Sequence, residues 1–119
     1  KEKYECAKDI DFKTFSFQFR NSIEHFYPRH YQGKEPPEWV EDFGNLALLT
    51  TGTNIEIQNS LPIDKANYFK RNNFQKYSLK LQIMSLITIN KGKWERSDAK
   101  QLREVMIELL ESDLQQLDV

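Results

Sequence analysis

The apolar positions in the first half of the chain fall into short groups separated by turn residues. Phe15, Phe17 and Phe19 alternate with polar residues, which favours a strand-like edge over a helix. The run NLALL at 45–49 stands between Gly44 and the turn sequence TTGT. A run of this length between turn signals is typical of a buried strand. Both groups therefore indicate strands.

The segment 32–44, QGKEPPEWVEDFG, has the composition of a loop. It contains Gly33, a Pro-Pro pair and Gly44, all of which are turn or loop signals. Pro37 is tolerated at the first position of a helix, because the amide proton that proline lacks has no partner there. The segment predicts a loop with one helical turn beginning at Pro37.

A helical spacing replaces these short runs from Pro62 onward. Ile63, Ala66 and Phe69 follow one another at intervals of three residues and would share one face of a short helix. The asparagine pair 72–73 would end that helix, since asparagine is common at helix ends and in turns.

Two further segments of the C-terminal half have helical patterns. The segment 77–89 is too apolar for a surface strand and predicts a buried helix, although the alternation L-x-L-x-I leaves a strand open. Ser97 or Asp98 would cap a long final helix. The apolar residues of this helix recur at helical spacing and are Leu102, Val105, Met106, Leu109, Leu110, Leu114 and Leu117.

The length and the cysteine content limit the kind of protein. The chain has 119 residues, the size of one domain with a modest core. It begins with Lys1 rather than Met, so we expect a piece of a larger protein, and no apolar run reaches the roughly 18 residues of a membrane span. A single cysteine, Cys6, excludes an internal disulfide and suits a reducing cytosol.

Charge is distributed unevenly, although the formal net charge is only −1. Between Pro62 and Arg103 there are ten Lys or Arg residues against three Asp or Glu residues, and every charged residue after Arg103 is acidic. A basic middle and an acidic end would suit a phosphate-facing surface backed by a solvated tail. Two ordinary exposed helix faces explain the same distribution, so both interpretations stay open.

Candidate chemistry is concentrated around the adjacent residues Glu24 and His25. The only other histidine is His30. Taken alone, an acid beside a histidine is more often a structural feature than a catalyst. Asn45 and, nine residues later, Asn54 follow in order, and each alone fits ordinary turn or capping chemistry. Their joint occurrence with the Glu-His pair favours a functional site.

The motifs IEHFYP, FGNLALLTTGTN and QNSLPIDKANYF, followed by a tryptophan before a helix, resemble the HNH nucleases. From about Ser22 to about Arg103 they are similar to the C-terminal nuclease domain of GmrSD-like type IV, modification-dependent restriction enzymes. The resemblance implies a metal-dependent DNA endonuclease of the bacterial cytoplasm that acts in antiviral defence. It also implies an α+β fold: one domain, 1–119, with a ββα-metal (HNH) core at about 15–72 and additional C-terminal helices at about 77–117.

The resemblance assigns roles to the motif residues. His25 would be the general base, because imidazole titrates near working pH. Glu24 and the amide oxygen of Asn54 would hold Mg²⁺ or Mn²⁺, and no structural zinc is expected, because the cysteine pairs of many HNH domains are missing. Asn45 would tie the loop 26–44 back onto the two strands and so orient His25.

Other residues would take part less directly. Lys65, Lys70 and Arg71 could contact DNA phosphates, which would position DNA without reading its sequence. His30 could touch metal-bound water or substrate, although a structural role is the simpler interpretation. Asn59 is an alternative metal ligand or a DNA contact.

The resemblance also implies partners. These are DNA and a nucleotide-hydrolysing N-terminal domain or partner subunit, with no membrane, while assembly with a second copy of the chain stays open. The competing hypothesis is a catalytically silent module that binds nucleic acid or protein on the same scaffold. The joint presence of Glu24, His25 and Asn54 argues against silence, because a decayed site would have no reason to hold all three.

Overall fold

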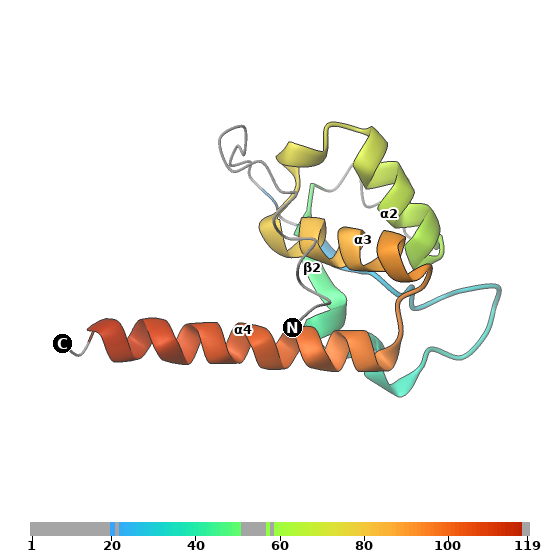
Figure 1. Cartoon of the computed structure of the whole chain (residues 1–119). Coiled ribbons are helices and arrows are strands. Elements are labelled where there is room, and N and C mark those ends of the chain that lie inside the picture. The colour runs from blue at the N-terminus through green and yellow to red at the C-terminus, as the bar shows by residue number, and fades with distance from the viewer. Residues whose placement is uncertain (1–19, 21, 51–56, 58, 118–119) are drawn as a thin grey trace.

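The computed structural model of the chain describes residue 20 and residues 22–50, 57 and 59–117. The predicted strand around Phe15, Phe17 and Phe19 and the predicted ligand Asn54 lie outside these residues. Two strands precede three α-helices in the described part of the chain (Figure 1). The elements are β1 (Ser22–His25), η2 (Glu38–Glu41), η3 (Phe43–Asn45), β2 (Leu46–Leu49), α2 (Pro62–Arg71), η4 (Phe74–Lys76), α3 (Leu79–Lys91) and α4 (Arg96–Leu117), where η marks a 3-10 turn.

β1 and β2 form an antiparallel hairpin, in which Glu24 lies opposite Ala47. Because side chains alternate along a strand, Glu24 and His25 point to opposite faces of the hairpin. The face of Glu24, Ala47 and Leu49 is buried, whereas Leu48 on the other face is 50% exposed. The strand predicted in NLALL is therefore confirmed, but only one of its faces is buried.

Two 3-10 turns organise the loop between the strands. The first, η2, follows Pro37, where one helical turn was expected. Before the second, the Asp42 side chain accepts a hydrogen bond from the backbone N–H of Gly44 at 3.0 Å. A Cβ at Gly44 would lie 1.7 Å from the carbonyl oxygen of Ala99 on α4. Only glycine lets the loop approach α4 so closely.

α2 and α3 confirm the helix predicted from the spacing after Pro62 and the helix predicted from the apolar segment 77–89. α2 buries Ala66 and Phe69, two of the three residues of the predicted apolar face. The hydroxyl of Ser78 caps α3 by accepting the backbone N–H of its third residue at 3.2 Å. Gly92 caps the end of α3, and its φ of 89° lies in the left-handed region that favours glycine. The strand alternative for 77–89 is therefore wrong.

α4 begins at Arg96, before both predicted capping residues Ser97 and Asp98. Asp98 Oδ2 accepts a hydrogen bond from the backbone N–H of Glu95 at 2.8 Å and another from Lys91 Nζ at 2.8 Å. The aspartate thus satisfies an amide just before the helix, as a cap does, although it lies inside the first turn.

The second half of α4 extends beyond the rest of the molecule (Figure 1). Leu102 is buried, whereas Leu109 and Leu110 are 61% and 60% exposed. Among the described side chains of the predicted apolar stripe, Leu102 therefore packs on the core, whereas Leu109 and Leu110 face solvent. No helix in the described ranges is long and apolar enough to span a bilayer.

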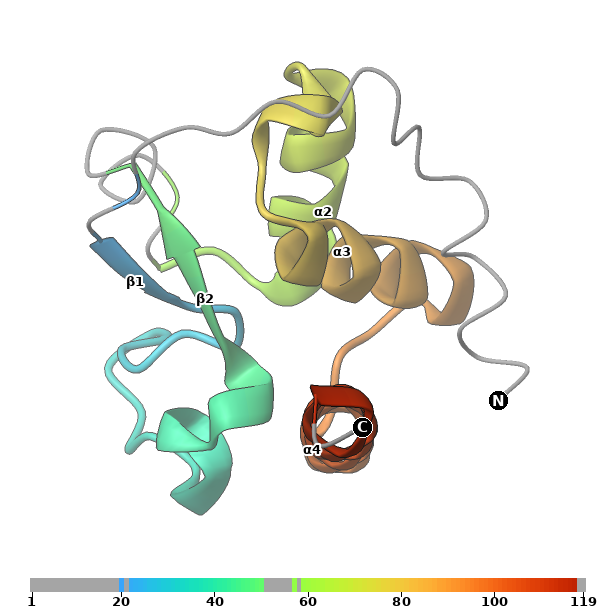
Figure 2. The ribbon, with the colours of Figure 1, turned by 90° about the vertical axis from the view of Figure 1, so that its left-hand side faces the viewer.

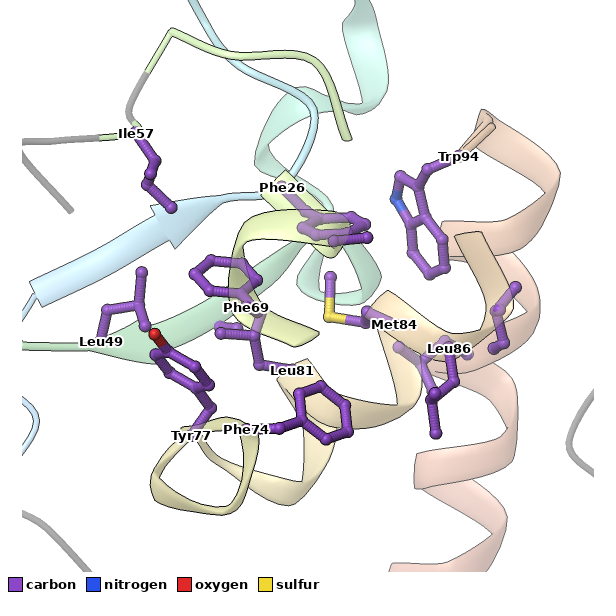
Figure 3. Packing of buried hydrophobic residues seen from close by; sticks show 14 of the residues in the cluster. Phe26, Leu49, Ile57, Phe69, Phe74, Tyr77, Leu81, Met84, Leu86 and Trp94 are labelled. Carbon is purple, nitrogen blue, oxygen red and sulfur yellow. The ribbon is translucent and has the colours of Figure 1, made fainter. Parts of the chain in front are cut away.

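The core lies between the hairpin and the pair of helices α2 and α3, with α4 below them in the view of Figure 2. Figure 3 shows Phe26, Phe69, Leu81 and Met84 packed together beside Trp94. The rings of Phe26 and Trp94 meet edge to face, with centroids 5.3 Å apart. The architecture is mixed α+β, as predicted.

Candidate active site

His25 lies at the end of β1 and contacts a side chain of the following loop. Its Nε2 is 2.8 Å from Oε1 of Glu41, the last residue of η2. Arg29 Nε lies 3.6 Å from the same oxygen. The His25 side chain is 18% exposed and that of Glu41 is 63% exposed. Solvent therefore reaches only part of the imidazole, while its partner carboxylate stands at the surface.

Glu24 points into the core, where it meets Lys65 of α2. Lys65 Nζ lies 3.0 Å from Glu24 Oε2, and the two side chains are 0% and 2% exposed. No directed hydrogen bond reaches Oε2 from the described residues, so the contact is an ion pair. Lys65 also donates a hydrogen bond to the carbonyl oxygen of His25 at 2.6 Å. One ammonium group thus holds both residues of the Glu-His pair.

Burial dominates the protonation of this pair. It raises the pKa of Glu24 from 4.5 to about 7, and the attraction of Lys65 counteracts only part of that rise. Burial also lowers the pKa of Lys65, and Glu24 opposes this shift. Glu24 therefore gains or loses its proton near neutral pH.

Asn45 is fully buried and connects the loop to the segment before α4. Its Nδ2 donates to the carbonyl oxygens of Val40 at 2.9 Å and Tyr27 at 3.2 Å. Its Oδ1 accepts from the backbone N–H of Tyr27 at 2.8 Å and from Trp94 Nε1 at 3.2 Å. Both donor hydrogens and both acceptor positions of the amide are therefore used. These bonds anchor the chain two residues after His25.

The described residues fit a divalent cation only in part. Glu24 Oε2 is a buried oxygen without a directed hydrogen bond, and such an atom can serve as a cation ligand. Lys65 Nζ, however, already brings a positive charge within 3.0 Å of it. In the part of the chain that the structure describes, no three His, Cys, Asp or Glu side chains are grouped as metal ligands. Asn54, the second predicted ligand, lies outside that part.

The positions of the predicted DNA contacts differ. Lys65 is fully buried and faces Glu24, so its assignment as a phosphate contact is corrected: the ammonium group has no path to a surface phosphate. Lys70 and Arg71, in contrast, are exposed in the last turn of α2. His30 and Asn59 are exposed as well.

Sequence patterns do not single out Glu41 or Arg29. Glu41 is 16 residues away from His25 and stands in a loop that also contains Glu38. Which of these acids meets the histidine depends on the path of the loop, and Asn45 helps to fix that path through its bond to Val40. The only sequence signal is an acid shortly before the asparagine of the motif.

Residues 1–109 match the family described as GmrSD restriction endonucleases, C-terminal domain. The chain belongs to this family. The match confirms the resemblance inferred from the motifs and indicates a role related to restriction endonucleases. No curated protein and no solved structure matches the chain. In this GmrSD C-terminal domain, the motif residues Glu24, His25 and Asn45 belong to the same end of the hairpin, but their side chains diverge: Glu24 meets Lys65 in the core and His25 meets Glu41 on the other face.

Proposed function

We propose that this GmrSD C-terminal domain is a DNA endonuclease in which His25 is the general base. The observation that carries the proposal is the anchored position of His25. Lys65 holds its carbonyl oxygen at 2.6 Å, and Glu41 contacts its ring nitrogen at 2.8 Å. Imidazole is the side chain best suited to take a proton from water at physiological pH, and a fixed ring lowers the cost of aligning it.

We also propose that the core is of the HNH, ββα-metal type. The order β1, β2, α2 supports this assignment. So does the contact that Lys65 of α2 makes with both Glu24 and the backbone of His25 on β1, because it brings the helix against the motif end of the hairpin.

Glu24 and Asn54 are the residues that would hold Mg²⁺ or Mn²⁺. A bound cation of this kind supplies charge neutralisation at the phosphoryl group and at the leaving oxygen. Lys65 would have to share Glu24 with the cation or move away from it, since Nζ lies 3.0 Å from Oε2.

Side chains of the domain would carry out the proton transfer and the positioning of DNA. His25 would take one proton from a water molecule, whose oxygen then bonds to phosphorus as the phosphorus–oxygen bond to the leaving sugar breaks. The electron pair of that bond leaves with the sugar oxygen, which takes up a proton from solvent. Lys70 and Arg71, exposed on α2, would contact DNA phosphates and position the strand.

The cellular setting we propose is bacterial cytoplasmic defence against phage DNA. In that setting the domain would work with a nucleotide-hydrolysing domain or subunit. The family description, which refers to restriction endonucleases, supports this setting.

A silent binding module is the second candidate function. The observation that favours it is the Lys65 ammonium at Glu24, because a carboxylate already paired in the core has less reason to take up a cation. Such a module would bind DNA through the exposed Lys70 and Arg71 without cutting it.

A plasmid assay separates the two functions. The 119-residue chain is incubated with supercoiled plasmid and Mg²⁺ or Mn²⁺, with and without EDTA, beside His25→Ala and the matched loop variant Glu38→Ala. The nuclease proposal expects metal-dependent nicking that His25→Ala lowers about 10²- to 10⁴-fold and Glu38→Ala retains. Binding of plasmid by the parent chain without nicking would support the silent module instead.

A further inference from the structure

The contact between His25 and Glu41 indicates which nitrogen of the His25 ring carries the hydrogen atom. An imidazole has two ring nitrogens, and in its neutral form one donates a hydrogen bond and the other accepts one. The Glu41 carboxylate lies 2.8 Å from Nε2 and can only accept when ionised. The hydrogen atom of this bond must therefore be on Nε2.

The other nitrogen is left available. With the hydrogen atom on Nε2, the lone pair of the neutral ring is on Nδ1. Within the described part of the chain, His25 Nδ1 takes part in no hydrogen bond. The ring thus presents an unused acceptor while its donor is occupied by a carboxylate.

Hydrogen bonds of the two neighbouring residues and the contact with Arg29 fix the position of Glu41. The Val40 carbonyl oxygen, one residue earlier, receives the buried Asn45 amide at 2.9 Å. The backbone N–H of Asp42, one residue later, donates to the Trp39 carbonyl oxygen at 3.0 Å. Arg29 lies 3.6 Å from the carboxylate oxygen that meets His25. Glu41 is therefore held from both sides, although its side chain is exposed.

We propose that Glu41 is a positioning residue for the nuclease reaction, because it holds the His25 ring with the lone pair of Nδ1 directed to the attacking water. The inference rests on the proposed function and specifies which atom of His25 accepts the proton. This atom is Nδ1, not Nε2. In this step one O–H bond of water breaks, the proton binds Nδ1, and the water oxygen keeps the electron pair for its new bond to phosphorus. The imidazolium that forms is stabilised by the Glu41 carboxylate at Nε2.

The first test needs no enzyme activity. Two-bond ¹H–¹⁵N correlation spectra of the metal-free 119-residue chain show which ring nitrogen carries the hydrogen atom. We expect it on Nε2 of His25, with a ring N–H proton that is protected from rapid exchange. Glu41→Ala should lose this protected proton, whereas Glu38→Ala, an acid of the same 3-10 turn, should keep it.

The second test measures cleavage. Glu41→Ala should lower kcat for plasmid nicking about 10- to 100-fold and leave KM for DNA nearly unchanged. Glu41→Gln should recover part of the loss, because its amide oxygen can still accept from Nε2. The exposed variant Arg71→Ala, by contrast, should act mainly on KM, since it removes a proposed phosphate contact.

The outcomes distinguish this inference from the function on which it rests. A hydrogen atom on Nδ1, or a protected Nε2–H that survives in Glu41→Ala, overturns the positioning role even if the chain cuts DNA. Equal loss of nicking in Glu41→Ala and Glu38→Ala overturns it as well. A protected Nε2–H in a chain that cuts no DNA with either metal overturns the proposed function and, with it, the role of Glu41 in positioning a general base.

Discussion

Two side-chain contacts start from neighbouring residues of β1 and lie in opposite surroundings. Glu24 meets Lys65 in the core, where both side chains are almost completely buried. His25 meets Glu41 at the surface, where the carboxylate is 63% exposed. The alternation of a strand is sufficient to separate them, since successive side chains point to opposite faces. The hairpin thus places a buried contact on one face and a surface contact on the other.

The two contacts differ in how much hydration their groups lose on folding. A buried ion pair loses the hydration of both groups, so removing one partner leaves an uncompensated charge or polar group in the core. An exposed pair keeps its hydration and contributes little to stability. We therefore expect stability to depend on the Glu24–Lys65 pair and catalysis to depend on the His25–Glu41 pair.

Removal of the Lys65 ammonium should have the largest effect on stability. Lys65→Met keeps much of the side-chain volume but leaves Glu24 without its counter-charge and the His25 carbonyl without its donor. We expect the free energy of unfolding in urea to fall by about 3 to 5 kcal/mol. The exposed lysine of the same helix, Lys70, is the matched control, and Lys70→Met should change it by less than about 0.5 kcal/mol.

A double variant sharpens this prediction. Glu24→Gln removes the acid that Lys65→Met leaves unpaired, so the double variant should be more stable than Lys65→Met alone. If Lys65→Met were no less stable than Lys70→Met, the buried pair would have no special structural role, and the contrast between the two contacts would be lost.

Asn45 anchors the loop that carries Glu41, because it bonds to Tyr27 at the start of the loop and to Val40 beside Glu41. Asn45→Ala would leave its four partner groups without the amide, among them the Trp94 indole N–H and the Tyr27 N–H. We expect a loss of about 3 kcal/mol in the free energy of unfolding. The exposed Asn59→Ala should stay within about 0.5 kcal/mol of the parent chain in the same urea titration.

The raised pKa of Glu24 predicts that the stability of the fold depends on pH. Its folded value of about 7 lies above the ordinary 4.5. Between these two values the unfolded chain has lost the proton and the folded chain still holds it, so stability falls as pH rises through this window. The total effect should be no more than about 3 kcal/mol. Urea titrations from pH 4 to 8 should show this fall, and Glu24→Gln should remove it.

A flat profile that is identical in the parent chain and in Glu24→Gln would contradict the buried position of the acid. Such a result would mean that water reaches the carboxylate and keeps its ordinary affinity for protons.

Local patterns predict the elements of this fold well, because they depend on neighbouring residues. The spacing of Ala66 and Phe69 predicts α2, and the turn residues around NLALL predict β2. The alternation within a strand also places Glu24 and His25 on opposite faces. Ser97 and Asp98 predict the start of α4 only to within two or three residues, since Asp98 caps an amide from inside the helix.

Contacts between distant residues are not predictable in this way. Lysines in an amphipathic helix usually lie at the surface, and the sequence therefore predicts that Lys65 contacts DNA. Its burial depends on Glu24, which reaches it only when α2 packs against β1, and the hydrogen bond to His25 spans 40 residues. Glu41 is missed for the same reason, since a loop has no periodicity that tells which acid faces the histidine.

The smallest expected effect completes the comparison. Glu41→Ala should lower the free energy of unfolding by no more than about 0.5 kcal/mol, because an exposed contact competes with water and with the freedom of its side chain. The measurement is a urea titration at pH 7 beside Lys65→Met. A loss as large as that of Lys65→Met would show that Glu41 supports the fold, and reduced cleavage by Glu41→Ala would then reflect an unstable protein. A small loss of stability combined with a large loss of kcat is the result that separates positioning of His25 from support of the hairpin.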